Sequence, residues 1–298
     1  MEKDNPNVRR LKETLSILRC GYYRKRIRKT KLKLSREEME EAYVLLPETV
    51  HSIVETGVWP KSQEDTICAY TCENLDSYAL ARKRYKEWNC LPDKENLNKI
   101  LVLNLANPVS PGGGVRRGAK AQEEDLCRSS SLLLSLESEK AKEYYGYNRQ
   151  LDSYLGSDAM IFTPNVEIIR DEYGELLDET AIVSVLTCAA PMILYGREGL
   201  SNDEYSSLVL NRIRGMLACA IYCGYQRIIL GAWGCGAFGN DAHVIAELFY
   251  RAVKQLGPTK GDKRLWFKNM DFAILDRSEE KYNFNEFNRL FGNGSKIG

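Results

Sequence analysis

Three apolar, strand-like runs, each followed by a helical pattern, restrict the possible folds of this chain most strongly. The runs are Lys99–Asn104, Ile182–Cys188 and Arg227–Leu230, and the helical patterns after them are Gln122–Leu136, Glu204–Cys223 and Ala242–Leu256. A last strand is expected at Asp271–Leu275. Strands that alternate with helices of ten or more residues are typical of an α/β domain. We therefore predict an α/β sandwich with a mostly parallel or mixed sheet.

The segment before these runs is expected to be an accessory unit. A chain of 298 residues is large for one domain and small for two, so we expect one core of roughly 200 to 250 residues with an extension. Residues 7–20 carry apolar side chains at helical spacing, and Tyr22–Leu34 alternates basic with larger residues as a hairpin would. We predict an N-terminal helical and hairpin segment, residues 1–60, packed on a main domain of residues 61–298.

The charge of the chain is divided unequally between these two parts. The formal net charge is only +1, yet residues 1–36 contain thirteen Lys or Arg against three Asp or Glu. The near-zero total therefore conceals a basic N-terminus and an acidic remainder.

No run approaches the roughly 20 apolar residues that span a bilayer, and the start lacks the apolar stretch of a secretory signal. A soluble, cytoplasmic protein without a membrane partner is expected.

The cysteines and histidines do not predict a metal site. The nine cysteines form no CxxC pair, and the only histidines are His51 and His243. Cys68 and Cys72, and likewise Cys219 and Cys223, stand four residues apart, as on one face of a helix. Reduced structural thiols are the expectation, because long cytosolic chains keep free cysteine as a small buried hydrophobe. We expect neither a metal nor a cofactor.

Two glycine-rich loops are the strongest functional signal. The first, Asn104–Gly114, follows an apolar strand and ends in Gly112, Gly113 and Gly114; the second, Gly231–Asn240, lies between a strand and a helix. Where a strand, a glycine turn and a helix follow one another, exposed backbone N–H groups and the helix N-terminus favour binding of an anion. A lone loop is weak evidence, because a tight turn needs glycine without any ligand. Two loops in one context predict a diphosphate, and neither has the spacing of a P-loop or of GxGxxG.

A pair of acidic residues follows the first loop. Gln122, Glu123, Glu124 and Asp125 open the predicted helix. Acids in the first turn of a helix often serve only to complement its dipole. Beside a phosphate loop, however, carboxylates are electrostatically unfavourable, which favours a chemical role. Adjacent helical residues point about 100° apart and cannot lie on opposite faces of a sugar as two glycosidase carboxylates do. One Glu would therefore act as both acid and base, while the other holds the sugar.

The run LANPVSPGGGVRRGAKAQEEDLCRSSSL resembles the signature of bacterial-type poly(ADP-ribose) glycohydrolases, in which a triple glycine precedes Gln-Glu-Glu. The run GAWGCGAFGND resembles the second diphosphate loop of the same family. The resemblance covers nearly the whole chain and implies a macrodomain-like three-layer sandwich without a metal. It also implies hydrolysis of ribose–ribose O-glycosidic bonds of poly(ADP-ribose), with release of ADP-ribose.

The resemblance also implies roles for individual residues. Glu124 would be the general acid and then the base, and Glu123 would orient the ribose. Contacts with ADP-ribose would come from Asn107, Gly112, Gly113, Gly114, Val115, Gln122, Gly234, Cys235, Gly236, Ala237, Phe238 and Gly239. Glu73 and Asn74 are candidates for the adenine end. Trp233 is ordinarily a core aromatic, although an aromatic among glycines can also form a flat wall for a ribose.

Several alternatives stay open at the level of sequence. A non-catalytic ADP-ribose reader is one, and the Glu pair argues against it because a reader needs no acid there. An enzyme that removes single ADP-ribose units from protein or nucleic acid is another. The basic N-terminus has three interpretations, in decreasing order: a segment packed on the domain, a contact with the polyanionic polymer, or nucleic-acid binding. The expected partners are poly(ADP-ribose), ADP-ribose and ADP-ribosylated proteins; nucleic acid is not expected.

Overall fold

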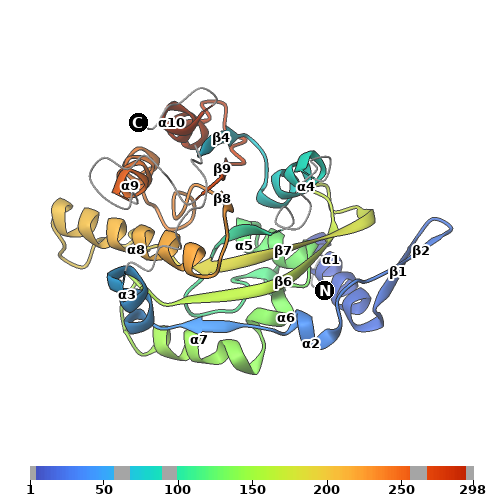
Figure 1. Cartoon of the computed structure of the whole chain (residues 1–298). Helices are drawn as coiled ribbons and strands as arrows, with labels where there is room; N and C mark the ends of the chain where they lie inside the picture. The colour runs from blue at the N-terminus through green and yellow to red at the C-terminus, as the bar shows by residue number, and fades with distance from the viewer. Residues whose placement is uncertain (1–4, 57–67, 89–98, 256–266, 293–298) are drawn as a thin grey trace.

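The computed structural model describes residues 5–56, 68–88, 99–255 and 267–292 (Figure 1). The strands are β1 (Tyr22–Lys25), β2 (Arg28–Lys31), β3 (Tyr43–Leu45), β4 (Ala69–Glu73), β5 (Ile100–Leu105), β6 (Met160–Arg170), β7 (Leu176–Cys188), β8 (Arg227–Leu230) and β9 (Asn269–Ala273). The helices are α1 (Pro6–Cys20), α2 (Arg36–Met39), α3 (Pro47–Thr56), α4 (Ser77–Trp88), α5 (Gln122–Ser129), α6 (Leu132–Leu136), α7 (Lys142–Arg149), α8 (Asn202–Tyr222), α9 (Ala242–Gln255) and α10 (Tyr282–Phe291). Single 3₁₀ turns lie at Val115–Arg117 and Glu139–Ala141.

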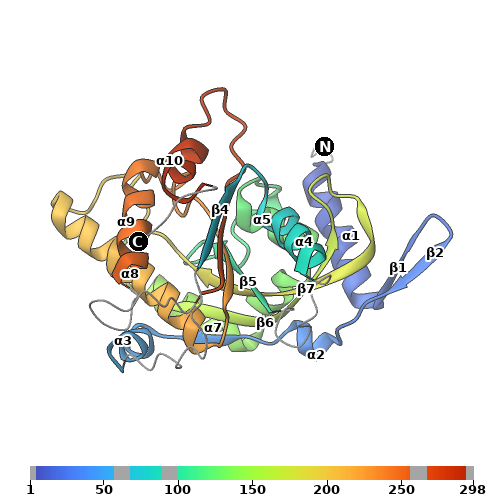
Figure 2. The same ribbon diagram turned by 45° about the horizontal axis from the view of Figure 1, so that its top comes forward.

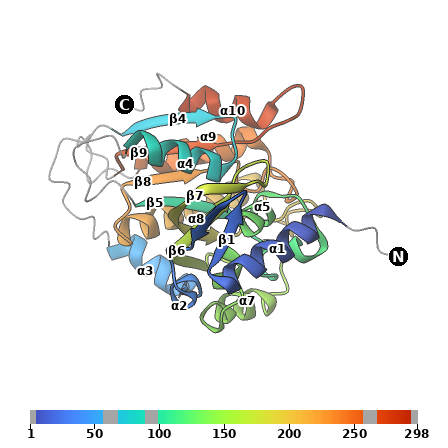
Figure 3. The ribbon, with the colours of Figure 1, turned by 90° about the vertical axis from the view of Figure 1, so that its right-hand side faces the viewer.

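Seven strands form one central sheet, in the order β3-β6-β7-β5-β8-β9-β4. Strands β7, β5, β8, β9 and β4 are parallel to their neighbours, whereas β6 pairs antiparallel with β7 and β3 antiparallel with β6. Figure 3 shows β4 at one side of this sheet and β6 toward the other. The structure confirms the predicted α/β class with a mixed sheet, and four of its strands lie where the apolar runs predict them.

Helices cover both faces of the sheet because successive strand residues point to opposite sides. Leu101 and Leu103 of β5 join a core that includes residues of α3, α8, α9 and α10. Ile100 and Val102 join a second core, with residues of α1, α4, α5, α6 and α7. Strand β5 is therefore apolar on both sides, as strands of a covered parallel sheet are. None of the described helices is long and apolar enough to cross a lipid bilayer.

The N-terminal segment packs on the second face. As predicted, it contains a helix, α1, and a hairpin, β1–β2, which extends away from the helices in Figures 1 and 2. The hydroxyl of Thr14 in α1 donates a 2.7 Å hydrogen bond to the carbonyl of Arg128 in α5. The backbone nitrogens of Lys33 and Leu34 donate to the buried Glu167 of β6. Residues 43–45 supply the edge strand β3, and the expected boundary between residues 60 and 61 lies outside the described residues.

Two details differ from the expected elements. The single helix predicted over Gln122–Leu136 is wrong, because the chain leaves helical geometry at Ser130, where φ is −150° and ψ is −175°. Here Ser130 bridges to Ile168 of β6, and the Ser131 hydroxyl accepts a 2.9 Å hydrogen bond from the backbone nitrogen of Glu167. The spacing of Cys68 and Cys72 is not helical either, since Cys72 lies in strand β4 and Cys68 directly precedes it.

Candidate functional site

The two glycine loops lie at the same edge of the sheet. Strands β5 and β8 are parallel neighbours, with Leu101 opposite Ile228 and Val102 opposite Ile229. The first loop continues from β5 and the second from β8, so both leave the sheet at its carboxyl edge. In open α/β sheets this is the edge where ligands bind. The structure thus brings together two segments that are more than 100 residues apart in the sequence.

The first loop packs directly against the two glutamates. Gly112 and Gly113 both adopt left-handed backbone geometry, with φ of 65° and 58°. A Cβ atom added to Gly113 would lie 2.5 Å from Oε1 of Glu124 and 3.1 Å from Oε2 of Glu123. The backbone nitrogen of Gly114 donates a 2.7 Å hydrogen bond to Oε1 of Glu124. Glycine is therefore required here by the approach of the carboxylates as well as by the backbone.

The two carboxylates have different hydrogen-bonding surroundings. Glu123 is 2% exposed; its Oε1 accepts from the Asn104 side chain at 3.2 Å and its Oε2 from the backbone nitrogen of Asn107 at 2.8 Å. Glu124 is 7% exposed, and its Oε2 is buried without a hydrogen-bond partner among the described residues. A buried polar oxygen without a partner is rare in native proteins and needs an explanation. Glu123 is thus held at both oxygens, whereas Glu124 retains one oxygen without a partner among the described residues.

Burial changes the acidity of Glu123. Desolvation raises the pKa of this carboxyl group to about 8, against the opposing effect of the hydrogen bonds from Asn107 and Asn104. The negative charge of Glu124 adds to the increase. A carboxyl group with such a pKa carries a proton through much of the neutral range. Burial therefore favours the protonated, neutral form of Glu123.

Helix α5 presents its N-terminus at the same place. Its N-cap residue is Ala121, which provides no side-chain hydrogen bond to the first turn. Uncapped N–H groups at a helix N-terminus attract anions. Gln122, the first residue of the helix, is used within the protein: its Oε1 accepts from the backbone nitrogen of Leu105 at 2.8 Å, and its Nε2 donates to the carbonyl of Leu103 at 2.8 Å and to Ser77 at 3.1 Å. These bonds attach the helix to the end of β5.

A cavity of about 610 Å³ lies between the N-terminus of α5 and the second glycine loop. Of the residues expected to bind ligand, Gln122, Gly234, Gly236, Ala237 and Phe238 line it. Such a volume suits a ligand the size of a nucleotide. The cavity is also bordered by Asp76 and Tyr78 at the start of α4 and by Arg10 of α1.

The second loop is fixed by buried side chains at its base. Gly234 has a φ of 77°, and a Cβ atom there would collide with Asn240 and Ala190. The side chain of Asn240 donates to the carbonyls of Pro191, at 2.8 Å, and Gly234, at 2.9 Å. Trp233 is fully buried and donates from its indole nitrogen to the carbonyl of Cys188 at 2.9 Å. Trp233 therefore serves the core and ties the loop to the end of β7.

Some expected ligand residues lie elsewhere. The side chain of Val115 is fully buried, and its backbone nitrogen donates a hydrogen bond to the carbonyl of Gly112. Both its side chain and its N–H group therefore contact the protein itself. Cys235 and Gly239 belong to the second loop but do not line the cavity. The first-loop glycines also lie outside its lining and contact the carboxylates instead. Asn107 uses its Oδ1 within the loop, accepting from the backbone nitrogens of Val109 and Ser110.

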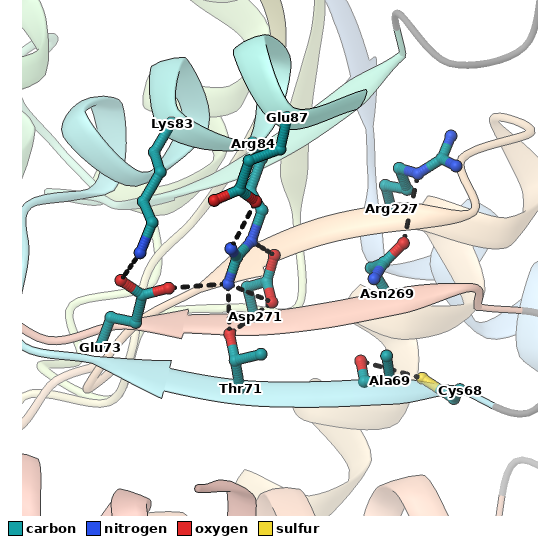
Figure 4. A network of polar contacts seen from close by, with 10 residues as sticks. All are labelled: Cys68, Ala69, Thr71, Glu73, Lys83, Arg84, Glu87, Arg227, Asn269 and Asp271. Carbon is teal, nitrogen blue, oxygen red and sulfur yellow. Dashed lines mark hydrogen bonds and ion pairs between the residues drawn. The ribbon is translucent and has the colours of Figure 1, made fainter. Parts of the chain in front are cut away.

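The two adenine candidates are engaged in other contacts. Glu73, at the end of β4, forms ion pairs with Lys83 and Arg84 of α4 (Figure 4). The side chain of Asn74 exchanges two hydrogen bonds of 3.0 Å with the backbone of Asp276. Neither residue lines the cavity, whereas Asp76, two positions further on, does.

Sequence reasoning missed the residues that support the site. Asn104 bonds to Glu123, 19 residues away, and Asn240 bonds to Pro191, 49 residues away, and both asparagines are buried. Each stands at the boundary of a glycine loop, which is the only local signal that could have singled them out. No group of three His, Cys, Asp or Glu side chains that could hold a metal ion occurs among the described residues.

Comparison with known proteins identifies relatives for this arrangement. A family model described as microbial-type PARG, catalytic domain, matches residues 11–171. The poly(ADP-ribose) glycohydrolase from Thermomonospora curvata, solved with the inhibitor ADP-HPD, is 28% identical, with a TM-score of 0.81 over 95% of this chain and 98% of that chain. The Deinococcus radiodurans enzyme in complex with ADP-ribose is 30% identical, with a TM-score of 0.73 over 87% of this chain and 98% of that one.

A search of curated proteins found no match. The family model, however, matches just over half of the residues of this chain. The two solved structures agree with it and extend the likeness over nearly the whole chain. The chain therefore belongs to the family of microbial-type PARG catalytic domains.

Proposed function

We propose that this protein is a poly(ADP-ribose) glycohydrolase that hydrolyses ribose–ribose O-glycosidic bonds and releases ADP-ribose. The observation that carries the proposal is the buried Oε2 of Glu124, which has no partner among the described residues and lies in a carboxylate pair beside the first glycine loop. Family membership and the relatives solved with ADP-ribose and ADP-HPD support it. We also class the fold with the macrodomains, on the basis of its mixed sheet covered on both faces.

Glu124 acts first as an acid and then as a base. Its Oε2 donates a proton to the departing ribose 2′-oxygen as the bond from that oxygen to the anomeric carbon breaks. The resulting carboxylate then takes a proton from a water molecule, whose oxygen forms the new bond to the anomeric carbon. The products are ADP-ribose and the shortened polymer, and Glu124 regains its proton. The hydrogen bond from Gly114 holds Oε1 and leaves Oε2 available for both steps.

The neighbouring groups hold the substrate. Glu123, fixed by Asn104 and Asn107, orients the ribose that is cleaved. The side-chain oxygen of Asn107 accepts hydrogen bonds within the loop, and its side-chain nitrogen, Nδ2, binds the ribose hydroxyls. The second glycine loop and the N-terminus of α5 bind the diphosphate, and Phe238 packs on the ribose. Val115 is fully buried and therefore is not among the residues that contact ADP-ribose.

The test of this function uses Glu124→Gln and labelled polymer. The wild-type protein should shorten the polymer and release ADP-ribose. Glu124→Gln keeps the oxygen that accepts from Gly114 but cannot transfer the proton, so turnover should fall at least 100-fold while ADP-ribose affinity stays within about tenfold. The exposed Glu139→Gln, which makes the same chemical change away from the cleft, should retain full activity.

Two results would contradict the proposal. Unchanged polymer together with tight ADP-ribose binding by the wild-type protein would indicate a reader without activity. Release of ADP-ribose only from mono-modified protein or nucleic acid would indicate an enzyme that removes single units. A large loss of ADP-ribose affinity in Glu124→Gln would assign Glu124 a binding role instead of a catalytic one.

A further inference from the structure

A basic hollow of about 520 Å³ lies between helix α1 and the β1–β2 hairpin. The cations that line it are Arg9, Arg10, Arg24, Lys25, Arg26 and Arg170. Among the described residues, its lining includes two carboxylates, Glu13 and Glu175. The hollow therefore concentrates the positive charge of the N-terminal segment on one side of the hairpin.

The basic hollow adjoins the proposed ADP-ribose cavity. Arg10, Arg170 and Gly174 line both spaces and so form their common border. Gly174 has a φ of 83°, and a Cβ atom there would collide with the guanidinium of Arg10. Arg10 itself donates a 3.2 Å hydrogen bond to the carbonyl of Tyr173. The glycine in the β6–β7 turn thus lets an arginine from α1 lie at the junction of the two spaces.

The cations of the hollow differ in how far the protein already uses them. Arg170 is buried and pairs with Glu13 at 2.8 Å, and Lys25 pairs with Asp178 at 3.1 Å. Arg24 and Arg26, by contrast, are exposed and form no ion pair with the described part of the chain. Unpaired cations that converge on a concave surface bind phosphates and steer polyanions toward it.

We infer that the basic hollow binds the diphosphate of a second ADP-ribose unit of the same polymer while the first unit occupies the cavity. The inference rests on the proposed function. It follows from the shared border at Arg10 and from the sign of the charge, because a polymer with a diphosphate in every unit must carry negative charge beyond the cavity. Double-stranded nucleic acid fits less well, since it offers no unit that could enter the cavity and so gains nothing from the shared border.

The experiment measures polymer binding in the Glu124→Gln background, where the substrate stays intact. In this background Arg24→Gln is combined with Arg26→Asn, because Asn tolerates the φ of 55° found at Arg26. The control combines Arg28→Gln with Lys31→Gln, which removes the same charge from exposed residues on the other strand of the hairpin. Fluorescence anisotropy then gives the affinity of each protein for long polymer, for ADP-ribose and for duplex DNA.

The variant with Arg24→Gln and Arg26→Asn should bind polymer at least fivefold more weakly than its Glu124→Gln parent. The control should bind it less than twofold more weakly, and the affinity for ADP-ribose should be unchanged in both. The slope of log affinity against log salt should also become shallower by about 1.4, since two phosphate contacts are lost at about 0.7 each on a single-stranded polyanion. Unchanged polymer affinity would overturn the inference while leaving the proposed function intact. An equal loss for duplex DNA, or an equal loss in the control, would also overturn it. Failure of the wild-type protein to cleave polymer would instead refute the proposed function.

Discussion

The backbone nitrogen of Gly114 and Oε1 of Glu124 form a 2.7 Å hydrogen bond that joins the first glycine loop to helix α5. The loop therefore serves the protein's own carboxylates as well as any ligand. Its glycines leave room for the side chains of Glu123 and Glu124, and its amide fixes one oxygen of Glu124. This contact explains why a triple glycine and a pair of acids occur together at such short spacing.

Gly113→Ala should nearly abolish activity. The added Cβ atom would lie 2.5 Å from Oε1 of Glu124, so this carboxylate must move away from its bond with Gly114. The φ of 58° at Gly113 adds about 1 kcal/mol of backbone strain for a residue with a side chain. We expect kcat on poly(ADP-ribose) to fall at least 100-fold while the protein remains folded, as measured by polymer cleavage and circular dichroism.

The control for this substitution is Gly146→Ala. Gly146 lies within helix α7, and a Cβ atom there would meet nothing within 4 Å. Alanine is favoured over glycine in a helix interior by up to about 1 kcal/mol, so this variant should be fully active and slightly more stable. Full activity in Gly113→Ala would mean that the contact with Glu124 does not matter for catalysis.

The raised pKa of Glu123 predicts a pH-dependent stability. The folded protein binds the Glu123 proton more tightly than the unfolded chain does, because burial raises the pKa to about 8 from an ordinary value of 4.5. The stabilisation is complete below the unfolded pKa and is lost as the pH rises from about 4.5 to about 8. Glu123→Gln removes this loss, so its free energy of unfolding relative to wild type should increase by a few kcal/mol between pH 5 and pH 9.

Urea denaturation at several pH values measures this difference. Glu139→Gln is the matched control, because it makes the same chemical change at an exposed position. A constant difference between Glu123→Gln and wild type across the range would show that Glu123 titrates as an ordinary exposed carboxyl group.

The central parallel strands could be predicted from sequence, whereas β3 and β6 could not. Strands β5 and β8 are continuous apolar runs because both of their faces are covered. Strand β3 has only three residues, and β6 contains Pro164 and the buried Glu167, so neither has a clear apolar pattern. Strand β6 pairs with β7 and bonds to Leu34 of the N-terminal segment, and β3 pairs with β6, so both strands depend on partners that lie elsewhere in the sequence.

The candidate site shows the same division. The glycine loops and the Glu pair form contiguous motifs that can be recognised from the sequence. The burial that raises the pKa of Glu123 cannot, because it comes from segments that meet only in the fold. The break between α5 and α6 also depends on a tertiary partner, since Ser131 bonds to the backbone of Glu167. Serines near helix ends often compete for backbone hydrogen bonds in this way.

Gln122→Ala tests whether Gln122 contacts the ligand or positions the helix. The substitution leaves the backbone nitrogen of Leu105 and the carbonyl of Leu103 without their present partners. Each buried group without a partner costs about 1–3 kcal/mol. We expect a clear loss of stability in urea and a lower kcat, with ADP-ribose affinity changed less than fivefold. Unchanged stability with a large loss of affinity would make Gln122 a ligand contact instead.

The ion-pair network around Arg84 predicts a different kind of dependence. Arg84 of α4 donates to the buried Asp271 of β9 at 2.9 Å, to Thr71 of β4 at 2.8 Å and to Glu73 at 2.8 Å (Figure 4). Burial alone would lower the pKa of Arg84, but the hydrogen bond and charge of Asp271 outweigh it and raise the pKa above its ordinary value. Arg84 thus holds the edge strand β4 to the rest of the sheet while it compensates a buried carboxylate.

Arg84→Met should destabilise the protein by about 3–5 kcal/mol, because it leaves the charge of Asp271 buried without its partner. The double variant Arg84→Met with Asp271→Leu removes both charges and should recover most of that loss, since an apolar pair of similar size can replace a buried ion pair. Chemical denaturation at pH 7 measures both. The contrary result would be a double variant whose loss of stability equals the sum of the losses in Arg84→Met alone and Asp271→Leu alone. The network would then stabilise the sheet through the hydrogen bonds of Arg84 to Thr71 and Glu73 and not through the compensation of the Asp271 charge.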